Sequence, residues 1–92
     1  MSHEFSFTTN ATDETLLRIL SETLVRFGIT LKESDLGAYS IENDQGWPKV
    51  SFQFGLDAHL SSNLSPNECE EILSAISRVA ELYSLVFSWE EL

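Results

Sequence analysis

Four polar side chains between residues 51 and 61 have the types that a nucleophilic catalytic centre uses. Asp57 and His59 lie two residues apart, and Ser51 and Ser61 share their odd parity, so one extended strand would place all four on one face. A Ser-His-Asp arrangement could be drawn from them. However, same-face neighbours in one strand point in parallel, whereas a triad needs convergent side chains and an oxyanion hole. We therefore interpret these residues as polar groups on a solvated or partner-facing sheet.

Metal, thiol and phosphate chemistry have no stronger support in the sequence. A metal site needs three or four converging ligands, and His3 and His59 share no ligand motif with each other or with the dispersed carboxylates. Cys69 is the only cysteine, and it falls on the apolar stripe of a predicted helix, where a buried thiol is inert. The four glycines are scattered and form no phosphate-binding loop. The sequence therefore predicts no catalytic residues, no metal and no cofactor.

The most informative property of the chain is its charge. Its 92 residues carry 15 Asp and Glu against 5 Lys and Arg, which gives a formal net charge of −10. Such a surface repels nucleic acid and anionic membranes and attracts basic proteins. We therefore expect no direct nucleic-acid binding and no membrane binding, and a basic protein or ribonucleoprotein complex as the partner.

Part of the acidic surplus has a local structural explanation. Carboxylates in the first turn of a helix interact favourably with the helix dipole, and this explains Asp13, Glu14, Glu68, Glu70 and Glu71. Two other groups of acidic residues have no such explanation, one in a loop and hairpin region and one near residue 92. With a tryptophan beside the hairpin they form the predicted partner-binding set, which is Glu33, Asp35, Glu42, Asp44, Trp47, Glu90 and Glu91.

Two alternative interpretations of this set stay open. In one interpretation, the acidic residues bind no partner and form a solvated surface that aids solubility. Trp47 can fold back over the core, because a small domain needs the aromatic area, or it can anchor an interface.

Alternating apolar residues predict strands over residues 4–9 and 38–43. The clearest alternation runs over residues 50–60, where every even position is apolar, and it predicts one long strand with a buried face and a wet face. Gly55 within it suggests a bulge or a bend. Residues 29–37 are compatible with a short strand or with a loop.

Capping residues mark the starts of two helices. The first begins near Asn10 or Thr12 and ends at Gly28. The second begins with a capping box, in which Ser65 is the N-cap and Glu68 the third helical residue, and its apolar stripe extends to Tyr83. After the second helix, alternation predicts a closing strand over residues 85–89, with continuation of the helix as the alternative.

These elements predict a single acidic α+β domain over residues 1–92. The order β-α-β-β-α-β favours a two-layer sandwich, with an antiparallel sheet and both helices on one face, which is similar to the ferredoxin-like fold. The sequence shows neither a signal peptide nor an apolar stretch long enough to span a membrane, so we expect a cytoplasmic protein.

In size and charge the chain resembles the small acidic phage-encoded inhibitors of bacterial defence, which include anti-CRISPR proteins and DNA mimics. The resemblance implies a non-enzymatic inhibitor that covers the DNA- or RNA-binding surface of a basic target, such as a CRISPR surveillance complex, with acidic residues. One alternative is an immunity protein that neutralises a nuclease toxin. Another is a small ligand-binding or enzymatic module, for which Asp57 and His59 would supply the polar groups.

Overall fold

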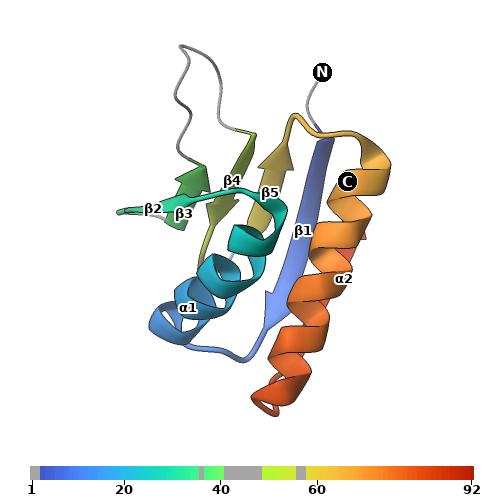
Figure 1. The fold of residues 1–92 in the computed structure, drawn as a ribbon. Coiled ribbons are helices and arrows are strands. Elements are labelled where there is room, and N and C mark those ends of the chain that lie inside the picture. Colours follow the sequence, from blue (N-terminus) through green and yellow to red (C-terminus); the bar gives the residue numbers. More distant parts are fainter. Residues whose placement is uncertain (1–2, 36, 41–48, 56–57) are drawn as a thin grey trace.

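The computed structural model describes residues 3–35, 37–40, 49–55 and 58–92, and these residues form an α+β fold with two layers (Figure 1). The strands are β1 (His3–Thr9), β2 (Leu31–Ser34), β3 (Gly37–Ser40), β4 (Val50–Gln53), β5 (His59–Ser62) and β6 (Phe87–Glu91). The helices are α1 (Asp13–Leu24), a 3-10 turn η1 (Val25–Phe27) and α2 (Pro66–Leu82). No helix in the described part of the chain is long and apolar enough to cross a membrane.

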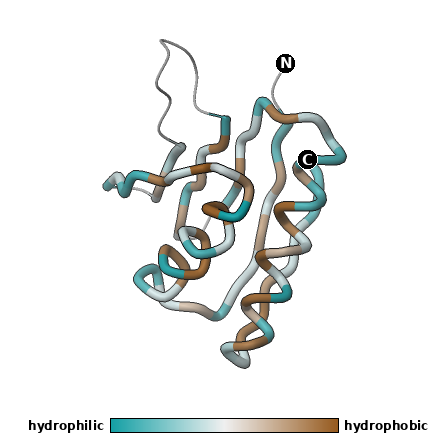
Figure 2. Tube along the Cα trace, in the orientation of Figure 1, coloured by the Kyte–Doolittle hydropathy of each residue, from teal (hydrophilic) through white to brown (hydrophobic). Residues whose placement is uncertain are grey.

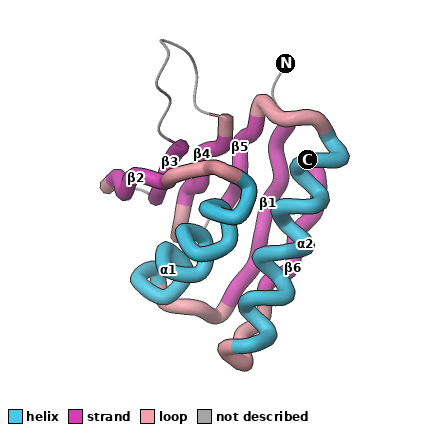
Figure 3. The backbone as a smooth tube through the Cα atoms, in the orientation of Figure 1, coloured by secondary structure: helices cyan, strands magenta, loops and turns pink. Residues whose placement is uncertain are grey.

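The strands form one antiparallel sheet with the order β2-β3-β4-β5-β1-β6. Both helices cover the same face of this sheet (Figure 3). Helix α1 contacts β2 and β3, α2 contacts β6, and the two helices contact each other. The first strand of the chain therefore lies inside the sheet, between β5 and β6, and β2 and β6 form its two edges.

The predicted class, an α+β fold with an antiparallel sheet and two helices, is confirmed, but the predicted order of elements is wrong. The described elements follow the order β-α-β-β-β-β-α-β, which differs from the ferredoxin-like order. Residues 31–34 form β2, which settles the ambiguity over residues 29–37 in favour of a strand. The single strand expected over residues 50–60 is a hairpin of β4 and β5, and Gly55 lies between them with a φ of 108° that favours glycine.

The core lies between the sheet and the helices. Apolar side chains alternate along the strands and recur with helical spacing along α1 and α2, as the changing hydropathy along each helix in Figure 2 shows. The buried set includes Phe5, Phe7, Phe52 and Leu60 from the sheet and Leu20, Leu24, Leu73 and Ile76 from the helices. Cys69 is also buried, at 1% exposure, as its place on the helical stripe predicts.

Side chains cap both helices at their first turns. Thr12 rather than Asn10 caps α1, because the Thr12 hydroxyl accepts a hydrogen bond from the Thr15 backbone N–H at 3.2 Å. Ser65 is confirmed as the N-cap of α2, because Glu68 N–H donates to Ser65 Oγ at 3.3 Å. The Glu68 carboxylate, which a capping box would place on the Ser65 backbone N–H, accepts instead from the Ser65 hydroxyl at 3.1 Å.

Helix α2 ends before the last strand begins, so the alternative of a continued helix is wrong. Ser84 adopts a left-handed conformation with a φ of 59°, which stops the helix and turns the chain back toward the sheet. Asn10 then accepts a hydrogen bond from the Val86 backbone N–H at 2.9 Å and fixes the entry to β6. The closing strand runs over Phe87–Glu91, two residues later than the predicted 85–89.

Candidate functional site

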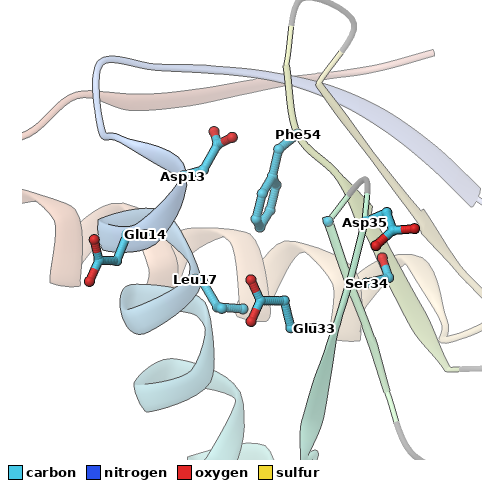
Figure 4. Close-up of a pocket in the computed structure, with 8 residues that line it drawn as sticks. Asp13, Glu14, Leu17, Glu33, Ser34, Asp35 and Phe54 are labelled. Atoms are coloured by element: carbon cyan, nitrogen blue, oxygen red, sulfur yellow. The ribbon is translucent and has the colours of Figure 1, made fainter.

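Acidic residues from two separate segments line an open hollow beside the β2–β3 hairpin (Figure 4). The hollow has a volume of about 640 Å³. Its lining comes from the first turns of α1, from the hairpin and from the residue after β4, and consists of Asp13, Glu14, Leu17, Glu33, Ser34, Asp35, Gly37 and Phe54. We call this site the acidic hollow.

The first turn of α1 places two of its carboxylates. Thr12 caps the helix immediately before Asp13 and Glu14, so both lie where the helix dipole favours negative charge. Leu16 next to them is buried in the core, which fixes this turn against the sheet. Figure 4 shows Asp13 beside the ring of Phe54, whereas Glu14 points outward from the helix.

Strand pairing places the third carboxylate. Glu33 is paired with Ala38, and Ala38 is buried on the face of the sheet that the helices cover. Glu33 therefore lies on that same face, toward α1, but remains exposed because β2 is an edge strand. In Figure 4 its carboxylate lies next to Leu17 and below Phe54, so an apolar surface adjoins the charge.

A close backbone approach holds the hairpin in this position. Gly37 is paired with Gln53 of β4, and a Cβ atom added at Gly37 would lie 1.9 Å from the carbonyl oxygen of Phe52. Only glycine allows the two strands to come this close. Asp35, two residues earlier in the turn, is thereby brought to the rim of the hollow.

None of the described residues that line the acidic hollow is basic, and four of them carry a carboxylate. Across the described ranges, no group of three or more His, Cys, Asp or Glu residues is arranged so that it could hold a metal ion. The four carboxylates are thus spread around the opening rather than directed at one point. This arrangement suits several separate ammonium or guanidinium groups, each of which can form its own charge-assisted hydrogen bonds.

The structure divides the predicted partner-binding residues between two places. Glu33 and Asp35 belong to the acidic hollow, at the β2 edge of the sheet. Glu90 and Glu91 lie on β6, at the opposite edge. Five strand spacings separate these edges, which amounts to about 24 Å. The other predicted residues, Glu42, Asp44 and Trp47, lie outside the described residues.

Asp13 and Glu14 line the hollow but were not among the residues predicted to bind a partner. Their position in a first helical turn already explained them, and no local pattern indicates that this turn faces the β2–β3 hairpin. The contact between α1 and the hairpin depends on the sheet order, which a single sequence does not reveal.

Ser51, His59 and Ser61 lie on the open face of the sheet, away from the helices. Ser51 is paired with Ser61, and His59 is paired with Gln53 on one side and Ser6 on the other. They share one face as predicted, but they come from two paired strands rather than one, and Asp57 lies outside the described residues. The result is a flat row of half-buried or exposed polar side chains.

No protein-family model matches this chain, and neither the curated proteins nor the solved structures contain a significant match to it.

Proposed function

We propose that this protein is a non-enzymatic inhibitor that binds a basic nucleic-acid-handling protein or complex and blocks its DNA- or RNA-binding surface. The observation that carries the proposal is the acidic hollow, in which carboxylates from α1 and from the β2–β3 hairpin face one opening without a basic neighbour in the lining. The net charge of −10 supports it, because the field of the whole molecule would steer a basic target toward the protein.

The hollow offers a lysine or arginine side chain two kinds of contact. Glu33 and Asp13 supply carboxylate oxygens that would replace the phosphate oxygens of a nucleic acid. Leu17 and Phe54 supply an apolar surface against which the aliphatic stem of the basic side chain can pack. A target whose basic residues are held in this way cannot use them for DNA or RNA, so inhibition is competitive with nucleic acid.

The target class follows from this chemistry. A CRISPR surveillance complex fits, because it holds a guide–target duplex in a long, positively charged channel. The partner is engaged through its phosphate-binding residues and not through its catalytic centre, so the protein needs no reactive group of its own.

The proposal is tested by affinity capture from bacterial lysate with the wild-type protein as bait, at about 50 mM and about 500 mM salt, because added salt screens exposed charges. We expect capture of a basic nucleic-acid-handling protein, weakened at high salt and abolished by competing DNA or RNA. The double variant Glu33→Lys/Asp35→Lys should lose at least about tenfold in affinity, since two charged contacts become repulsive.

The matched control is Glu70→Lys/Glu71→Lys, which changes the net charge by the same amount on the exposed surface of α2. This control should retain most of the binding. Equal losses in both double variants would show that net charge alone, and not the hollow, attracts the partner. Capture of no basic protein at either salt concentration would contradict the proposal.

A further inference from the structure

Strand β6 ends the sheet with an edge whose unpaired backbone groups can be identified. Leu92 N–H donates to the carbonyl oxygen of Glu4 at 2.9 Å, and Phe7 N–H donates to the carbonyl oxygen of Ala58 at 3.1 Å. Even-numbered residues of β1 therefore bond to β6, and odd-numbered ones bond to β5. By the same alternation, the backbone groups of Ser88 and Glu90 point into the sheet, and those of residues 87, 89 and 91 point outward.

One of these outward-pointing backbone groups already has a hydrogen-bond partner. Ser77 of α2 donates its hydroxyl to the carbonyl oxygen of Phe87 at 3.4 Å, so the helix covers the beginning of the edge. Among the strands formed by the described residues, none lies beyond β6 in the sheet. The N–H and C=O groups of Trp89 and Glu91 are therefore positioned to pair with an additional strand.

The side chains along this edge favour a basic occupant. Glu90 is exposed on the open face of the sheet, and Glu91 is exposed on the face that the helices cover. Glu4 of the neighbouring strand adds a further exposed carboxylate on the open face. Trp89 is half-buried beside Phe87, with ring centroids 6.4 Å apart, and offers an apolar contact at the rim.

The same charges disfavour a second copy of this chain at the edge. Two copies would each carry a net charge of −10 and would bring identical acidic edges together. Proteins commonly protect edge strands with charged side chains against such self-pairing. An extended segment with basic residues carries positive charge, so the acidic edge attracts it.

We infer that the β6 edge accepts an extended basic segment of a partner protein as an added antiparallel strand. This inference rests on the proposed function for the basic character of the partner, and extends it by a second contact surface. Backbone hydrogen bonds would come from Trp89 and Glu91, as in other cases of strand addition. Residues opposite Glu90 and Glu91 would be basic and the residue opposite Trp89 apolar, so the segment carries two consecutive basic residues followed by an apolar one.

The test uses a fluorescent synthetic peptide in which two consecutive lysines precede a valine in a threonine background. Binding is measured by fluorescence anisotropy against the wild-type protein, Glu91→Pro and Glu91→Gln. Proline at this position removes an outward N–H group but none of the bonds between β6 and β1. We expect a loss of about tenfold or more for Glu91→Pro, which lacks a hydrogen-bond donor and obstructs the added strand. We expect a loss of only about two- to fivefold for Glu91→Gln, which lacks one exposed charge.

Amide hydrogen exchange on the wild-type protein provides a second measurement that needs no variant. In the free protein, the amides of Trp89 and Glu91 should exchange quickly and those of Ser88 and Glu90 slowly. Peptide binding should protect Trp89 and Glu91, and this alternating pattern would support strand addition. Protection without alternation would contradict it.

Further outcomes would also decide the question. Absence of peptide binding, or equal losses in Glu91→Pro and Glu91→Gln, would overturn the inference. So would a wild-type dimer in sedimentation analysis that Glu91→Pro converts to a monomer, because a second copy would then occupy the edge. The Glu91 comparison and the exchange of the amides of residues 88–91 report on the β6 edge alone, which lies at the opposite side of the sheet from the acidic hollow, so failure at the β6 edge is distinguishable from failure of the acidic hollow.

Discussion

Replacement of Gly37 by alanine tests whether the β2–β3 hairpin is held against β4 as closely as described. Gly37 is buried and paired with Gln53, and the position of a Cβ atom there lies 1.9 Å from the Phe52 carbonyl oxygen and 2.8 Å from the Phe52 carbonyl carbon. These neighbours are backbone atoms, so no side chain can rotate away to make room. The strands themselves must separate.

The size of the effect follows from the required displacement. Cβ atoms essentially never approach another heavy atom within 3.0 Å, so the strands must move apart by about 1.1 Å at this point. A shift of this size takes the hydrogen bonds around Gly37 out of their normal range, and each contributes about 1 kcal/mol net. With the strain of overpacking included, we expect a loss of about 2–4 kcal/mol in the free energy of unfolding. In a domain of this size that lowers Tm by roughly 10–30 °C.

The assay is thermal and urea unfolding of wild type, Gly37→Ala and Gly28→Ala, followed by circular dichroism. Gly28 is the control, because its Cβ would meet no atom within 4 Å and the only cost arises from its φ of 74°. This cost is about 1–2 kcal/mol. A Gly37→Ala protein no less stable than Gly28→Ala would refute the close approach, and with it the placement of Glu33 and Asp35 at the hollow.

Three further predictions concern the core, a cap and a titrating group. Leu60→Ala should lower the free energy of unfolding by about 2–5 kcal/mol in urea denaturation, because Leu60 is fully buried in the middle of the sheet; a loss below about 1 kcal/mol would contradict this packing. Ser65→Ala should cost about 1 kcal/mol, because it removes the acceptor of the Glu68 N–H at the N-cap of α2; unchanged unfolding would show that the cap contributes nothing. The pKa of Tyr83 is raised, first by the hydrogen bond that its hydroxyl donates to Glu22 at 3.1 Å and second by the charge of Glu22. The protonated phenol is therefore favoured in the folded state, so this contribution to stability is present below about pH 10 and is lost as the pH rises further. In an ultraviolet titration of tyrosinate, Glu22→Gln should lower the Tyr83 midpoint, and an unchanged midpoint would contradict the contact.

The two helices and the first and last strands in chain order were predicted, because the patterns that indicate them involve only residues close in sequence. The Ser65–Glu68 capping box and the apolar stripe depend only on neighbours within a few residues, and α2 begins where they indicate. The β4–β5 hairpin was missed for a specific reason. Phe52 is paired with Leu60, so even positions before and after the turn face the same side, and the alternation continues across the hairpin as if it were one strand.

The candidate site was only partly predictable for a related reason. Glu33 and Asp35 were selected because nothing local explained their charge, and both line the acidic hollow. Asp13 joins them only because α1 lies over the β2–β3 side of the sheet. That placement results from long-range packing, for which a single sequence gives no periodic signal.

The position of β1 in the sheet has a consequence for the order of events during synthesis. Of the six strands described, β1 is synthesised first, yet both of its neighbours, β5 and β6, come from the second half of the 92 residues. The pairing of Phe5 with Glu91 closes a loop that spans almost the whole chain, which is entropically costly and slow. The nascent chain therefore cannot complete its sheet until translation has passed β6. Until then, Phe5 and Phe7 of β1 lack the strand neighbours that flank them in the folded sheet.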